Sequence, residues 1–258
     1  MSNLIRMDIH RMFKARSFKV CLVLAFLFGF LGIPLARLFS LILTFLPDSI
    51  EIGELLPKSV TISSILQKPF PGMNSILIMF SVCYFYYADI EQGYIKNIAG
   101  QVSKKGYTMI SRYIAVILHN LVFIATGIIG NLIGTALFVR LIVDEEILKT
   151  LGSLGLRFLL LQGLCAILLL VTCGLGSKIF GMVLSVVFGA GLMSLLYLSI
   201  DSAVSLAFKT KIAIEQYMPD QLMDQTAPAL IPALPVAVLT IAVFLFLAVR
   251  VFDRREVR

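Results

Sequence analysis

The sequence predicts an all-α membrane protein with six transmembrane helices. Hydrophobic residues make up 59% of the chain and charged residues 14%, and the mean hydropathy is +0.96, far above the usual range for soluble domains. Apolar runs of about 18 or more residues, which suit a helix crossing about 30 Å of hydrocarbon, recur along the whole length. The runs are continuous and lack the alternation typical of outer-membrane strands, so they are expected to be helices. Residues 1–258 are therefore expected to form a single transmembrane domain.

Six apolar runs are the expected spans. They cover residues 18–40, 72–88, 113–139, 154–175, 179–200 and 230–250. The first run is too long for a cleaved signal peptide, and no small-residue cleavage site follows it.

The distribution of charge predicts how these spans are oriented. If both termini, the segment after the second span and the turn at residues 176–178 share one side, that side holds 14 of the 22 Lys and Arg residues and five of the 15 acidic residues. Its net charge is then +9, against −2 on the other side. By the positive-inside rule both termini are cytoplasmic. The net charge of +7 is thus a signal of topology, and nucleic-acid binding is not needed to explain it.

Residues 1–17 are expected to form an amphipathic interfacial helix that leads into the first span at a sharp angle. Apolar and basic side chains are spaced so that they separate onto two helical faces. The apolar face carries Leu4, Ile5, Ile9, Met12 and Phe13, and the polar face carries Arg6, His10, Arg11 and Lys14. The alternative is a merely basic flank that follows the orientation rule.

The segment 201–229 mixes Asp, Lys and Pro with apolar residues, so it is expected to form short helices on the extracytoplasmic surface.

The third predicted span contains features of close helix packing. Gly127, Gly130 and Gly134 lie one turn apart, which would allow another backbone to approach. The polar residues in the third and fourth spans are expected to form hydrogen bonds between helices, and they are His119, Asn120, Asn131 and Gln162.

Signatures of enzymes are missing from the sequence. The apolar-then-acidic string 141–145 imitates a magnesium-binding strand of ATPases, but no Gly-x-x-x-x-Gly-Lys-Ser/Thr phosphate loop occurs. Neither a nucleophile elbow nor a His-Glu-x-x-His helix is present. The chain has only two histidines, and its four cysteines all lie inside predicted spans. We therefore expect no metal site and no catalytic residues.

The most informative segment is 88–112, a polar and basic interruption between the second and third spans. Ile90, Tyr94, Ile98 and Val102 recur every four residues. This spacing predicts a cytoplasmic helix with one apolar ridge. A simple linker would not need such a ridge.

This segment also resembles a known signature. Glu91, Gly93, Ile95, Lys96 and Asn97, followed by Ser103, Lys105 and Arg112, look like the Glu-x-Gly-x-Ile-Lys-Asn pattern after the second span of type-2 ABC transporter permeases. These are the membrane subunits of bacteriocin and lantibiotic self-protection exporters and of exporters of phenol-soluble modulin peptides. The resemblance covers the whole chain in layout and about twenty residues as a motif.

The resemblance implies a function and partners. The segment would be a coupling helix docked on a separate ATP-binding subunit, and two permeases, identical or similar, would assemble with two such subunits. ATP and Mg would bind the partner, with no cofactor in this chain. The residues implied in the contact are Asp89, Glu91, Gly93, Tyr94, Ile95, Lys96, Asn97 and Lys104.

The expected cargo is an amphipathic or antimicrobial peptide, carried out through the bacterial cytoplasmic membrane. Two alternatives stay open at this point. One is an exporter of drugs, sodium or polysaccharide with the same architecture. The other is a membrane scaffold or immunity protein that does not transport.

Overall fold

The structure, a computed structural model, describes residues 2–43, 59–68, 73–91, 93, 106–174, 176–208, 214–225 and 227–254. The helical elements are α1 (Ser2–Lys14), α2 (Arg16–Leu43), α3 (Ile62–Gln67), α4 (Met73–Glu91), α6 (Tyr107–Phe138), α7 (Ile147–Leu169), a π-helical turn (Leu170–Gly174), α8 (Lys178–Gly189), α9 (Met193–Phe208), a 3-10 turn η3 (Glu215–Tyr217), α10 (Pro219–Asp224) and α11 (Leu230–Arg254). Two short strands, β1 (Ser59–Thr61) and β2 (Arg140–Ile142), complete the described elements.

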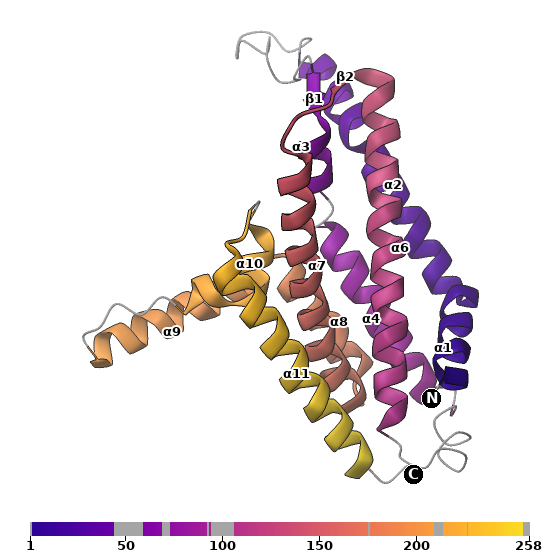
Figure 1. Ribbon diagram of the computed structural model, residues 1–258, viewed down its shortest axis with the longest axis vertical. Helices are drawn as coiled ribbons and strands as arrows, with labels where there is room; N and C mark the ends of the chain where they lie inside the picture. Colours follow the sequence, from indigo (N-terminus) through magenta and orange to yellow (C-terminus); the bar gives the residue numbers. More distant parts are fainter. Residues whose placement is uncertain are drawn as a thin grey trace.

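The long helices run between two ends of the molecule (Figure 1). At one end, β1 and β2 pair in parallel with Ser59 opposite Arg140, and we call this the strand end. At the other end lie α1, the start of α6 and the end of α11, and we call this the terminal end. The first described helix and the end of the last one, which were expected on the same side of the membrane, therefore lie at the same end of the molecule.

The fold is that of a helical membrane protein, with fewer clear spans than the six predicted. Among the described residues, four helices are long and apolar enough to cross a membrane, namely α2, α6, α7 with its π-helical turn, and α11, and the bent pair α8 and α9 would be a fifth if it forms one span. Large apolar side chains on their outer faces are exposed, such as Leu137 at 64% and Leu239 at 62%. The apolar part of α4, Met73–Ala88, is shorter than 18 residues, so this second predicted span is not confirmed.

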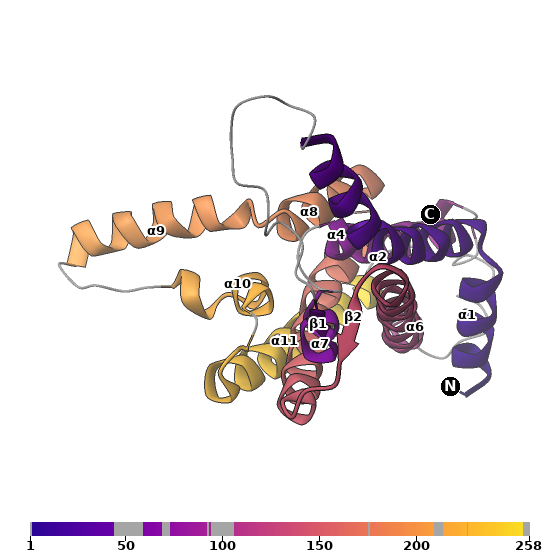
Figure 2. The same cartoon turned by 90° about the horizontal axis from the view of Figure 1, so that it is seen from above.

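The fifth predicted span, 179–200, is broken. Its two halves, α8 and α9, are bent by 76°, and α9 projects away from the other helices (Figures 1 and 2). The break occurs at Gly191, whose φ of 68° lies in the left-handed region. The N–H groups of Gly191 and Leu192 donate to the carbonyls of Phe188 and Val187, which is the hydrogen-bond pattern of a Schellman C-cap. With 12 residues, α8 is about 18 Å long and cannot cross alone.

Short helices follow α9, within the segment expected to contain them. Tyr197 of α9 donates its hydroxyl hydrogen to Asp220 of α10 at 3.2 Å, and Asp201 accepts from the backbone N–H groups of Ile214 and Glu215. Burial raises the pKa of the carboxyl groups of Asp220 and Asp224. These contacts hold the 214–224 return against α9.

Backbone contact between α2 and α6 depends on missing side chains. A Cβ atom on Gly130 would lie 2.5 Å from the carbonyl oxygen of Phe26, and one on Gly134 would lie closer still to that of Phe30. Gly127 contributes its carbonyl, which faces Gly29 of α2, while the space around its own Cα is open. The glycines singled out from the sequence therefore line the contact between α6 and α2.

Polar side chains join α6 to its neighbours at mid-height. His119 shares one hydrogen bond with Ser81 of α4 at 3.0 Å, and Asn120 donates to Gln162 of α7 at 3.3 Å. Asn131 differs from the expectation, because its amide donates to the Gly127 carbonyl of its own helix.

Arg157 holds the strand end together from the middle of α7. Its side chain is 1% exposed. It donates to the carbonyl of Met223 in α10 at 2.8 Å and to that of Gln67 in α3 at 2.9 Å. Two short helices from distant parts of the sequence are thus attached to α7 by one guanidinium group.

We predict that Gly134→Ala destabilises the protein and that Gly127→Ala does not. The new methyl group at 134 must displace the backbone of α2, and overpacking of this kind costs about 1–3 kcal/mol. At 127 no atom lies within 4 Å of the added carbon. Thermal unfolding of the two purified variants measures the difference, and equal melting temperatures would contradict the packing described.

We also predict that Arg157→Met lowers the free energy of unfolding by about 2–4 kcal/mol, because hydrogen bonds from a charged group are worth about 1.5–3 kcal/mol and a buried and a part-buried carbonyl lose their donor. Arg140→Met, which removes an exposed guanidinium in the same part of the molecule, serves as the control. Urea or thermal melts in detergent check both. Equal melting temperatures for Arg157→Met and Arg140→Met would contradict this role of Arg157.

Candidate functional site

The candidate site is the set of polar contacts at the terminal end that lie on both sides of residues 94–105 in the sequence. Most of the predicted contact residues, Tyr94, Ile95, Lys96, Asn97 and Lys104, lie outside the described residues, as does the side chain of Asp89. Glu91 and Gly93 are described, and so are the residues around Gly106 where the chain enters α6.

On the first side, α4 ends at Glu91 and the chain turns at Gly93. Gly93 has a φ of 66°, and its N–H donates to the Ile90 carbonyl at 3.2 Å. This left-handed residue stops the helix. The ridge predicted to run from Ile90 to Val102 is therefore interrupted at Gly93, and its later positions lie outside the described residues.

Glu91 pairs with a residue that the sequence did not associate with it. Its carboxylate lies 3.7 Å from the ammonium of Lys178, the first residue of α8. The same ammonium lies 4.3 Å from the centre of the Tyr84 ring, a cation–π contact. The Glu91 side chain is 58% exposed, so solvent screens the ion pair and its contribution to stability is under about 1 kcal/mol. This contact links α4 to α8.

On the second side, the start of α6 is attached to α11. The backbone N–H of Gly106 donates to the Asp253 carboxylate at 2.6 Å. A carboxylate at a helix N-terminus also interacts favourably with the helix dipole. A Cβ atom on Gly106 would lie 2.6 Å from Val249, so α11 packs directly against this turn.

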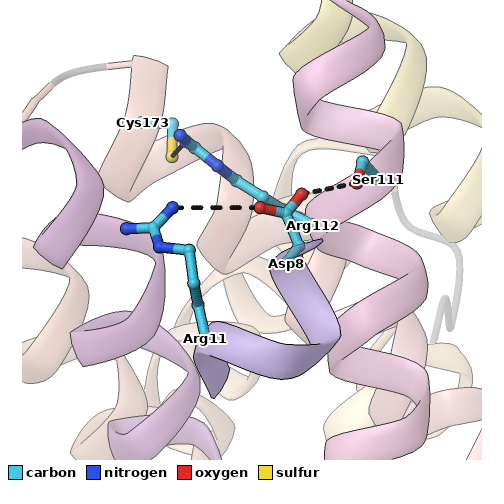
Figure 3. A network of polar contacts seen from close by, with 5 residues as sticks. All are labelled: Asp8, Arg11, Ser111, Arg112 and Cys173. Atoms are coloured by element: carbon cyan, nitrogen blue, oxygen red, sulfur yellow. Dashed lines mark hydrogen bonds and ion pairs between the residues drawn. The ribbon is translucent and has the colours of Figure 1, made fainter. Parts of the chain in front are cut away.

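One turn further along, α6 is attached to α1 and to the π-helical turn (Figure 3). Ser111 donates its hydroxyl hydrogen to Asp8 of α1, and Arg11 lies 3.9 Å from the same carboxylate. The neighbouring Arg112 points to the other side and approaches the sulfur of Cys173 at 3.8 Å. Asp8 and Arg112 are 2% and 1% exposed. Buried charges of this kind hold their partners firmly, because losing one leaves the other uncompensated.

Sequence reasoning counted Asp8 only as a charge that orients the spans, and it counted Arg112 as such a charge and as part of the permease-like signature. Asp8 and Ser111 are 103 residues apart, and no spacing rule relates positions at that distance. One feature of the sequence could have pointed to the burial of Asp8. It is a carboxylate on the otherwise basic helix 1–17, and it lies four residues before Met12, an apolar residue that is also buried.

The described contacts attach the two sides of residues 94–105 to different neighbouring helices, α4 with α8 on one side and α6 with α1 and α11 on the other. In the described part of the chain no group of three or more His, Cys, Asp and Glu residues could hold a metal ion.

Comparison with known proteins adds no family. No family model matches the chain, and neither curated proteins nor solved structures give a match.

We predict that Asp8→Ala frees α1 from α6. Losing the carboxylate removes the buried acceptor of the Ser111 hydroxyl and the partner of Arg11, which is a quarter exposed, and leaving a buried polar group unsatisfied costs about 1–3 kcal/mol. Hydrogen exchange of the α1 amides should become faster, with α7 little changed. Arg6→Ala, an exposed position on the opposite face of α1, is the control, and unchanged exchange in Asp8→Ala would contradict the role of this contact.

Proposed function

We propose that this chain is the permease subunit of an ATP-driven exporter, in which residues 92–105 receive movement from a separate ATP-binding subunit. One observation carries the proposal: the two flanks of that segment are attached by polar contacts to two different groups of membrane helices. A displacement of the segment would act on both groups at once. In other chains a rigid element joined to two domains at its ends is a common means of switching between two states.

Three further features support this proposal without establishing it. The chain is a helical membrane protein, and its sequence contains no phosphate loop, so ATP would have to act through a partner. The segment carries the Glu-x-Gly-x-Ile-Lys-Asn pattern of type-2 permeases. The amphipathic or antimicrobial peptide cargo, and the assembly of two permeases with two ATP-binding subunits, rest on that resemblance.

In this mechanism the ion pair of Glu91 with Lys178 has a definite task. It would keep α8 moving with α4 when the segment is displaced. Because Glu91 is more than half exposed, removing the ion pair should leave the melting temperature nearly unchanged. It should lower the number of peptides exported per ATP hydrolysed. A second task, contact with the ATP-binding subunit, is also open to Glu91 because more than half of its side chain is accessible.

A charge swap separates these two tasks. Glu91→Lys should uncouple ATP hydrolysis from export, since two ammonium groups then face each other. If the task is internal, the double variant Glu91→Lys with Lys178→Glu restores the ion pair and recovers most of the coupling. If Glu91 contacts the ATP-binding subunit, the double variant stays uncoupled.

The measurement requires a candidate ATP-binding subunit, sought among the neighbouring genes and co-expressed with this chain. The complex is reconstituted in liposomes, and peptide transport is counted per ATP hydrolysed. Lys149→Glu, an exposed charge reversal at the strand end, is the control and should behave as the unaltered protein. Failure of the unaltered chain to form a stable complex with that subunit would overturn the proposed function itself.

A further inference from the structure

The face of α1 that points away from α6 lines a cavity of about 620 Å³. This cavity is separate from the contacts described above, because Asp8 and Met12 are buried on the opposite face of α1. The described residues that line it are Asn3, Arg6, Met7, Ile9, His10 and Phe13.

The lining has a polar half and an apolar half. Arg6, His10 and Asn3 supply hydrogen-bond donors, while Ile9 and Phe13 supply apolar surface next to them. No carboxylate occurs among the described lining residues, and the nearby Asp8 is engaged by Arg11 and Ser111. The cavity is therefore suited to a molecule with an anionic head and an apolar body.

The position of α1 fixes which molecule that is. The helix ends at Lys14, and α2, a membrane-spanning helix, begins at Arg16. Figure 2 shows α1 turned across the direction of α2 at the edge of the bundle. Because its inner face is held against α6, Arg6 and His10 are presented outward beside the end of a span, at the depth where lipid headgroups lie.

We propose that this face of α1 binds an anionic phospholipid. Arg6 holds the phosphate, since a guanidinium group can donate two parallel hydrogen bonds to it, and a ring N–H of His10 donates a further one. Ile9 and Phe13 contact the first carbons of an acyl chain. The apolar half is what distinguishes a lipid from free phosphate as the occupant. The proposal does not depend on export or on an ATP-binding subunit.

The absence of tryptophan from the chain allows a direct test. Phe13→Trp places a single tryptophan in the cavity. The full-length variant is reconstituted in vesicles of phosphatidylcholine in which about one lipid in five is phosphatidylglycerol, an anionic lipid. Bromine on the acyl chains of either lipid quenches tryptophan on contact. We expect brominated phosphatidylglycerol to quench several times more strongly than the same mole fraction of brominated phosphatidylcholine.

Variants then assign the selectivity to the lining. A cation near an anionic surface contributes up to about a five-fold preference, so Arg6→Gln should remove most of the difference between the two quenching constants, and Arg6→Gln with His10→Gln should bring their ratio to about one. Arg254→Gln removes an exposed guanidinium from the same end of the molecule on α11, and it should leave the ratio unchanged.

Equal quenching by both brominated lipids would overturn the proposal, and so would a loss of selectivity in Arg254→Gln as large as that in Arg6→Gln. It would also be overturned if inorganic phosphate at about 10 mM removed the difference in quenching. The last would assign the site to a soluble anion. Should Phe13→Trp fail to fold, Asn3→Trp provides the same measurement from the other side of the cavity.

Discussion

A polar side chain inside an apolar helix bundle needs a hydrogen-bond partner, and where that partner lies on another helix it helps to decide which helices meet at that level of the protein. Water is excluded there, so an unpaired group costs several kcal/mol. Arg157 of α7 donates hydrogen bonds to one carbonyl in each of two short helices, α3 and α10. At mid-height His119 and Asn120 connect α6 to α4 and α7. At the terminal end Asp8 connects α1 to Ser111 of α6. The apolar surface drives association, and these contacts select the neighbours.

The same constraint divides the terminal end into a firmly held part and a lightly held part. The contacts of α6 with α1 and α11 include a buried carboxylate and a backbone N–H bound at 2.6 Å, so this group should move as one body. At this end the contact between α4 and α8 is an ion pair with Glu91 more than half exposed, although further along the two helices pack closely and Cys83 shares a buried hydrogen bond with Ser185 at 3.2 Å. The Glu91 ion pair is therefore the weaker attachment at the terminal end.

Much of the helical framework could be predicted because it depends on apolar runs. α2, α6, α7 and α11 lie where the sequence places spans, since about 20 apolar residues can do little else in a bilayer. The break at Gly191 was missed, because glycine is common in membrane helices and only the backbone reveals a positive φ. The partners of Glu91 and Arg157 were missed for another reason. They depend on how helices pack, and no local pattern of residues specifies which distant carbonyl or ammonium a charged side chain will meet.

The central claim is that two groups of helices move relative to each other at the terminal end while each stays rigid. In a version with Cys21, Cys83, Cys165 and Cys173 replaced by Ser, spin labels at Ile179 and Arg254 report on the distance between the groups, and labels at Leu137 and Arg254 report within one group. Double electron–electron resonance is recorded with the ATP-binding subunit bound, in ADP and in a non-hydrolysable ATP analogue. We predict that the nucleotide shifts the first distance distribution and leaves the second unchanged. A shift within the α6–α11 pair, or no shift between the groups, would contradict the account.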